Sequence, residues 1–449
     1  MDWEKLGEKF PYLENDVKEA VLSILKASER EDREFNIISF YSGLGREINN
    51  IEDTWIKRIN DECNEYPSVC EGLARGISEL KEIKKEKFMT LISSKLMAIY
   101  VLSKIDLSIP TLKDGIIYAI DVIKEEKNLG EVGKNFGENY RRMPIEIKEK
   151  MKELLNNSSF AYEFLRAINL NEFSDIYNFK NSEVMEVIGE KFNQLNDFQK
   201  RKILFSADRG LGRGIGKIFD SLTYSWKLNI IEEAKNNKEF ALGLIECIDL
   251  EYIQDKVFFE LLNIALKDCK LSFAMGTNLG QNFSYLTEDL KSKVEEITFE
   301  NKEFAKGIGN GFSITFNKFF DLFMNYKELK EEDEIRILNL ALKNKDVAEG
   351  ILQNLSYIIL SKHKNKILKL VENNEQYIEK FLKLLNRRVN EFDIDELFNL
   401  AKGKYMVELG KILCENFPQL NKEKRKKIIE KIENRDFYQG FLECGDKTS

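Results

Sequence analysis

The segment that most resembles a chemical motif is residues 210–217, whose sequence GLGRGIGK places four glycines before a lysine. Glycine-rich loops that end in lysine cradle phosphates, because backbone N–H groups and an ammonium surround the anion. The phosphate-binding loop also needs a glycine five residues before Gly216 and a Ser or Thr after the lysine, and these positions hold Leu211 and Ile218. A dinucleotide-binding turn would need a preceding strand, whereas the flanks have helical periodicity. We therefore interpret these glycines as part of a helix and expect no cofactor.

Residue types used for acid–base or metal chemistry are sparse. His363 is the one histidine, and its basic surroundings, SKHKNK at 361–366, predict an exposed surface residue with no nucleophile motif nearby. The six cysteines, at 63, 70, 247, 269, 414 and 444, include no C-x-x-C pair, so neither a zinc site nor a disulfide framework is indicated. We expect no catalytic residue and no metal site, which favours a protein that is not an enzyme.

A basic cluster near the C-terminus is a candidate partner-binding site. It precedes the apolar residues 428–432, so it is expected to form the polar first turn of a helix, and a solvated helix face is the ordinary interpretation. Contact with phosphate is the alternative, although the net charge of −8 lacks the basic excess typical of nucleic-acid binding. The cluster consists of Lys422, Lys424, Arg425, Lys426 and Lys427.

The aromatic residues that follow this cluster extend the candidate surface. Phe437, Tyr438 and Phe441, together with Leu442, lie in a stretch that begins at Asn434 and is expected to form one helix. Their positions are spread around much of the helix circumference, so either the preceding helices cover them or a partner does. We favour the first interpretation, and the second would make this end a protein-binding surface.

These candidates stand on a repeated helical pattern. Asn followed by an acidic residue two positions on and an apolar face recurs at Asn157 (without the acidic residue), Asn237, Asn301, Asn344 and Asn434. Asn is a preferred N-cap, and the apolar spacing of three and four predicts amphipathic helices, not strands. The intervals of 64 between Asn237 and Asn301 and of 90 between Asn344 and Asn434 are close to multiples of 31. We predict an all-α fold, an α-solenoid of stacked helical hairpins with a period of about 31 residues.

Glycines four residues apart recur in the expected first helix of the unit. Each glycine inside a helix costs about 1 kcal/mol relative to alanine, so something must offset this cost in every unit. We interpret the pairs as places where a neighbouring helix approaches closely, with exposure of backbone to a ligand as the alternative. The pairs are Gly72 and Gly76, Gly133 and Gly137, Gly210 and Gly214, Gly276 and Gly280, and Gly307 and Gly311.

The organisation along the 449 residues is continuous. No proline occurs between residues 145 and 417, and no Gly/Ser/Pro-rich linker interrupts this interval. We expect an N-terminal helical region with degenerate repeats over 1–125 and more regular hairpins over 126–449, continuous with it. No apolar run approaches a membrane span and the N-terminus has no signal-peptide pattern, so we expect a cytoplasmic protein with no membrane partner.

Residues 279–283 (LGQNF), 188–192 (IGEKF) and 132–136 (VGKNF) resemble the Leu-Gly-x-x-Tyr step of a TPR first helix. The layout over 126–449 resembles the broad α-solenoid class of TPR and HEAT proteins, although the second-helix alanines and terminal proline of TPR units are absent. The resemblance implies a non-catalytic interaction scaffold that binds a protein or peptide. Charge is unevenly spread, with 16 acidic and 9 basic side chains in residues 1–66 and 15 acidic and 19 basic in residues 361–449, which permits self-association. The alternatives are a nucleic-acid-binding solenoid that uses its C-terminal basic face and a HEAT-like DNA-repair glycosylase.

Overall fold

A computed structural model describes residues 2–27, 30–173, 179, 181–249, 256–317, 329–385, 388–403 and 405–445. Of these residues 80% are helical, and none lies in a strand. The predicted all-α class is therefore confirmed. None of the described helices is long and apolar enough to cross a membrane. The chain divides into two compact units, residues 1–215 and 216–449, and the division falls within α14. The predicted change from degenerate to regular repeats at residue 125 stays a prediction.

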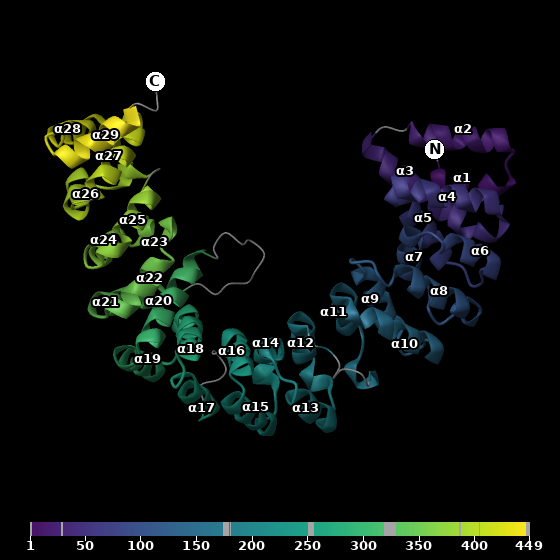
Figure 1. Cartoon of the computed structure of the whole chain (residues 1–449), viewed down its shortest axis with the longest axis horizontal. Helices are drawn as coiled ribbons and strands as arrows, with labels where there is room; N and C mark the ends of the chain where they lie inside the picture. The colour runs from purple at the N-terminus through teal and green to yellow at the C-terminus, as the bar shows by residue number, and fades with distance from the viewer. Residues whose placement is uncertain are drawn as a thin grey trace. The chain divides into compact units, whose positions relative to one another are not determined.

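In the N-terminal unit, helices α1, α3, α5, α7, α9 and α11 pack against one another in chain order (Figure 1). Helices α4, α6, α8 and α10 pack against one another in the same way as a second layer. The helices are α1 Trp3–Lys9, α2 Asn15–Lys26, α3 Arg30–Arg46, α4 Asp53–Glu65, α5 Pro67–Ser78, α6 Lys85–Leu91, α7 Lys95–Leu102, α8 Lys113–Ile123, α9 Gly130–Asn139, α10 Ile145–Met151, α11 Ser158–Ala167, α12 Ser182–Glu190, α13 Asp197–Leu204 and α14 Arg209–Ile218.

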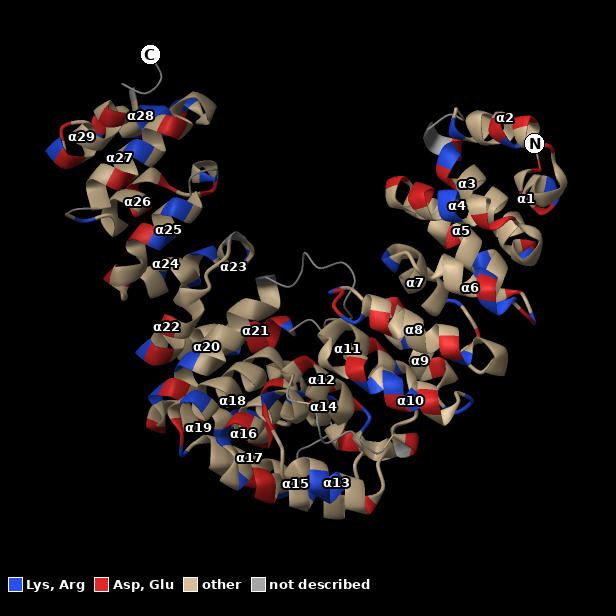
Figure 2. Cartoon of the chain, turned by 45° about the vertical axis from the view of Figure 1, so that its right-hand side comes forward, with Lys and Arg blue, Asp and Glu red and all other residues tan. Residues whose placement is uncertain are grey.

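In the C-terminal unit, α16, α18, α20 and α22 pack in sequence, as do α25, α27 and α29. Acidic and basic residues are interspersed along the helices (Figure 2). The helices are α15 Tyr224–Asn236, α16 Lys238–Cys247, α17 Lys256–Ala265, α18 Cys269–Gln281, α19 Glu288–Glu300, α20 Lys302–Asn317, α21 Glu331–Lys343, α22 Lys345–Gln353, α23 Tyr357–Lys362, α24 Lys364–Glu372, α25 Ile378–Leu385, α26 Ile394–Leu400, α27 Tyr405–Asn416, α28 Lys422–Glu430 and α29 Arg435–Gly445.

Asparagine N-caps join successive helical hairpins as well as starting helices. The side-chain oxygen of Asn157 accepts from the N–H of Phe160 at 3.0 Å, while its Nδ2 donates to the carbonyl of Glu126 at 2.6 Å. Asn301 and Asn344 each make the same two kinds of bond, one within their own helix and one to a residue 29 to 46 positions earlier. Ser, Thr and Asp can also cap a helix, but only the amide offers an acceptor and a donor with fixed geometry. This explains the use of Asn at these three positions.

A second asparagine motif occurs in both units with identical spacing. Residues 133–139 (GKNFGEN) and 276–282 (GTNLGQN) share the pattern Gly-x-Asn-x-Gly-x-Asn in α9 and α18. In each, the first Asn is buried and donates to two carbonyls at the C-terminal end of a preceding helix, one within the helix and one just after it. The bonds span 33 and 30 residues in both units: Asn135 to Leu102 (2.8 Å) and Ile105 (2.9 Å), and Asn278 to Ile245 (2.6 Å) and Ile248 (3.0 Å).

The link from first to second helix also follows a repeated pattern. A fully buried Phe three residues after a glycine begins a short 3-10 turn, and a buried Leu three residues further on ends it. The buried ring and leucine fix the direction of the chain before the next helix begins. The pattern occurs at 189–195 (GEKFNQL), 216–222 (GKIFDSL) and 280–286 (GQNFSYL).

All ten predicted glycines lie where two helices approach closely. At each of them, a Cβ atom would come within 3.0 Å of a backbone atom of a neighbouring helix. Gly133 would meet the carbonyl oxygen of Phe160, and Gly276 and Gly307 face each other across α18 and α20 with their Cα atoms in the contact. Residues 210–217 lie within α14, where Gly210 and Gly214 face the carbonyls of α12. These contacts support the interpretation that the glycines allow neighbouring helices to pack closely.

We expect Gly133→Ala to destabilise the protein by about 1–3 kcal/mol, because the methyl group must push α9 away from α11. Helix propensity alone would predict the opposite sign, a gain of about 1 kcal/mol. Gly130→Ala in the same helix is the matched control, since its Cβ would have no neighbour closer than 3.4 Å. Urea denaturation followed by circular dichroism checks the difference, and a stabilised Gly133→Ala variant would contradict the packing account.

Candidate binding cavity

Most cations of the predicted C-terminal cluster make contacts within the fold. Lys427 forms ion pairs with Asp393 at 2.8 Å and Asp395 at 3.0 Å. Lys424 donates to backbone carbonyls of Val389 and Asn390, and burial lowers the pKa of its ammonium. These two side chains help to join α28 to the preceding hairpin.

The other three cations differ in exposure. Arg425 is half-buried, donates to the carbonyl of Pro418 at 2.6 Å and lies 5.7 Å from the ring centroid of Phe417. Lys422 and Lys426 are exposed. The predicted cluster thus supplies two exposed lysines on α28, of which Lys426 pairs with Glu430 at 3.8 Å, instead of a continuous basic face.

The predicted aromatic residues of α29 divide between its two sides. Phe437 is fully buried and its ring centroid lies 4.6 Å from that of Phe398. Phe441 is half-buried, and its ring centroid lies 5.7 Å from that of Phe417, so Phe441 and Arg425 both contact the same ring. Tyr438 is 43% exposed. The preceding helices therefore cover Phe437 and part of Phe441, whereas Tyr438 and Leu442, which is 50% exposed, remain on the surface.

The expectation that His363 is an exposed surface residue is wrong. Its side chain is 8% exposed and its Nε2 lies 2.8 Å from a carboxylate oxygen of Glu334, which is itself 4% exposed. Lys362 donates to the other oxygen of the same carboxylate at 2.7 Å. The basic residues around His363 predicted a solvated side chain. The buried carboxylate of Glu334, 29 residues earlier, requires hydrogen-bond partners, and His363 and Lys362 supply them.

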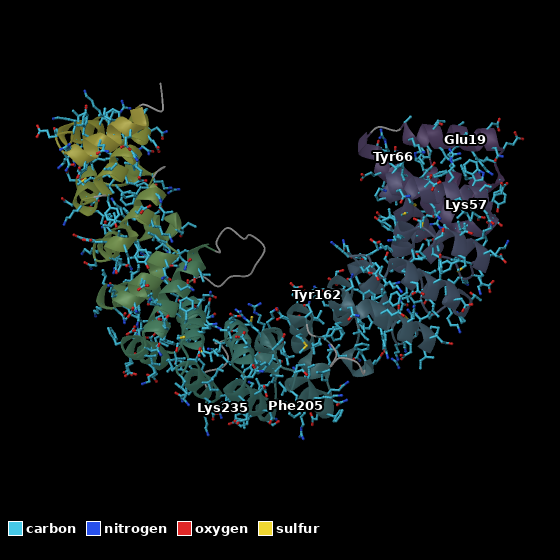
Figure 3. The ribbon with its side chains drawn as sticks, viewed as in Figure 1. Glu19, Lys57, Tyr66, Tyr162, Phe205 and Lys235 are labelled. Atoms are coloured by element: carbon cyan, nitrogen blue, oxygen red, sulfur yellow. The ribbon has the colours of Figure 1, made fainter. Side chains whose placement is uncertain are left out.

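The structure places a polar cavity of about 690 Å³ in the N-terminal unit, at residues that the sequence did not single out. Its walls come from α4, from the start of α7 with the two serines before it, and from the residues after α8; Figure 3 labels Lys57. The lining residues are Lys57, Asn60, Asp61, Asn64, Ser93, Ser94, Lys95, Leu96, Ile99 and Glu126.

The register of α4 explains why its polar side chains face this cavity. Trp55, Ile56, Ile59 and Cys63 are buried in the core. Residues 57, 60, 61 and 64 follow the spacing of three and four that places side chains on one helix face. This face is adjacent to the buried one, so it lies at the edge of the core and opens onto the cavity.

Asn60 lines the cavity and has one hydrogen-bond acceptor without a donor. It is 7% exposed, and its Nδ2 donates to the carbonyl of Thr90 at 2.9 Å, but its Oδ1 is buried without a hydrogen-bond partner. The orientation of the amide is fixed, because the Thr90 carbonyl can only accept. An unsatisfied buried acceptor costs about 1–3 kcal/mol, so a donor from outside the protein would be favourable there.

Some of the other polar residues of the cavity have partners within the fold and others do not. Lys95 and Glu126 form an ion pair at 2.9 Å. Asp61 and Asn64 are exposed and have no hydrogen-bond or ion-pair partner among the described residues, and the same holds for Lys57. Helix α7 begins at Ser94 without a side-chain cap. The site therefore offers acceptors from α4 and, from α7, a helix N-terminus whose N-cap side chain makes no capping hydrogen bond.

Comparisons of the chain with protein-family models, curated proteins and solved structures give no match.

We expect Glu334→Gln to lower the melting temperature at pH 7, because the neutral amide loses two charge-assisted hydrogen bonds. Burial alone raises the pKa of Glu334, but the hydrogen bonds from His363 and Lys362 outweigh it and hold the pKa below the ordinary 4.5. A carboxylate with a depressed pKa stabilises the fold above its ordinary pKa and loses this contribution as the pH falls. Thermal unfolding from pH 7 to pH 3 should show the two proteins converging below about pH 4.5; an unchanged gap would contradict the assignment.

Proposed function

We propose that this chain is a non-catalytic α-solenoid scaffold that binds a protein or peptide partner. Three features support the solenoid arrangement: first helices that pack in chain order, hydrogen bonds that join residues 30 and 33 apart in both units, and glycines at the closest approaches. These separations agree with hairpins that repeat about every 31 residues. We propose the cytoplasm as its compartment.

The cavity beside α4 is the observation that carries the binding function. Its volume falls in the range of about 300–1,000 Å³ that is usual for ligand sites. The lining combines amides, hydroxyls, both signs of charge and a small apolar part at Leu96 and Ile99. An extended peptide presents donors and acceptors in alternation, and the unpartnered Asn60 oxygen and the uncapped start of α7 provide one group for each. We therefore favour a peptide over a purely anionic or purely apolar ligand.

The nucleic-acid alternative receives less support. A phosphate backbone is held by exposed cations along a continuous track, whereas Lys424 and Lys427 are engaged within the fold. A glycosylase would need carboxylates and aromatic side chains in one cleft, and no aromatic residue lines the cavity beside α4.

Selection from a display library of random peptides, with the full chain as bait, tests the proposal. Peptides that bind with micromolar to millimolar dissociation constants are expected, and Asn64→Trp should weaken them about tenfold or more by filling the cavity. Glu65→Trp is the matched control, because Glu65 is exposed on the same helix and does not line the cavity. Failure to enrich any peptide would overturn the scaffold proposal. Equal binding to both variants would place the site elsewhere.

Binding of an oligonucleotide is the contrasting outcome. If an oligonucleotide binds, weakens steeply with salt and is released by Lys422→Ala with Lys426→Ala, the nucleic-acid alternative is correct.

A further inference from the structure

The cavity beside α4 is lined on one wall by hydrogen-bond acceptors that lack donors. The buried oxygen of Asn60 has no partner, and Asp61 and Asn64 have none among the described residues. Asn60 and Asp61 are adjacent in α4, and Asn64 lies one turn further along the same side of the helix. Asn60 is 93% buried, so its orphaned oxygen is a fixed feature of the cavity and not a solvated surface group. The group that completes this wall must be a donor.

The charge of the surrounding chain indicates a cationic donor. Residues 1–66, which include α4, carry 16 acidic and 9 basic side chains. Within the cavity, Glu126 is paired with Lys95, which leaves Asp61 and Lys57 as the charges without partners. Lys57 is exposed, and its long flexible stem allows the ammonium to remain in water. Asp61 is adjacent to Asn60 in the sequence, so a cation bound there would be stabilised by attraction to the carboxylate and by hydrogen bonds to the amide oxygens.

We propose that this cavity receives the guanidinium group of an arginine side chain supplied by the partner. The inference rests on the proposed peptide-binding function and adds the chemistry of the peptide. A guanidinium presents five N–H donors in one plane, so it can donate to an amide oxygen and to a carboxylate at once. It is also less strongly hydrated than an ammonium, which favours entry into a part-buried site. The stem of the arginine would lie against Leu96 and Ile99.

Saturation-transfer NMR with three small probes tests this assignment on the full chain. The probes are the N-acetyl amides of arginine, citrulline and lysine; citrulline keeps the shape of arginine but replaces the guanidinium with a neutral urea. We expect the arginine probe to bind in the millimolar range and about tenfold more tightly than citrulline. The lysine probe is expected to bind more weakly than arginine.

Two isosteric variants locate the effect. Asp61→Asn should weaken the arginine probe about tenfold, because it removes the one free carboxylate of the wall while keeping its shape. Glu65→Gln is the matched control on the same helix, with the same change of charge, and should leave binding unchanged. Lys57→Ala should strengthen binding a few-fold by removing a like charge.

The outcomes separate this inference from the scaffold proposal. Equal binding of arginine and citrulline, tighter binding of lysine, or equal loss in the Asp61 and Glu65 variants would overturn the guanidinium assignment. In that case, the scaffold proposal would still hold if library peptides bind the wild-type chain and are weakened by Asn64→Trp. Conversely, specific binding of the arginine probe without any peptide enrichment would retain a guanidinium site and reject the scaffold.

Discussion

The fold depends on the distance at which successive helices approach each other. In both units, helices that face one another come so close that a side chain as small as a methyl group would collide with a backbone carbonyl. Only glycine is compatible with this separation, and the short distance lets Cα–H groups contact the carbonyls across the interface. In some pairs the two glycines face each other directly, as Gly276 does with Gly307 and Gly189 with Gly214. Where they occur, the buried Asn bonds and the 3-10 turns then set the direction of the chain from one helix to the next.

Much of this arrangement could be predicted from the sequence. The all-α class followed from apolar periodicity and from the absence of proline, and the Asn caps marked where helices begin. The glycine pairs predicted close packing because their propensity cost required an offset. The second role of Asn157, a bond to Glu126, could not be predicted. It depends on where the end of one hairpin lies relative to the start of the next, which no local pattern encodes.

The sites were predicted less well, and the reason is physical. Clusters of like charge and aromatic residues are visible in a sequence, but their neutralisation by residues 28 to 35 positions away is not, as Lys427 with Asp393 illustrates. His363 was misjudged for the same reason. Asn60, Asp61 and Asn64 share a helix face that the spacing alone could have identified. What makes them a candidate site is an oxygen buried without a partner, and this follows only from packing.

A double-mutant cycle at Gly276 and Gly307 tests the central claim about helix separation most directly. Each single change to alanine should destabilise the C-terminal unit. The double variant should cost clearly less than the sum, because one displacement of α18 from α20 accommodates both methyl groups. Additive costs would show that the two glycines act independently, and stabilisation by either change would show that backbone entropy outweighs packing. Either result would contradict the account given above.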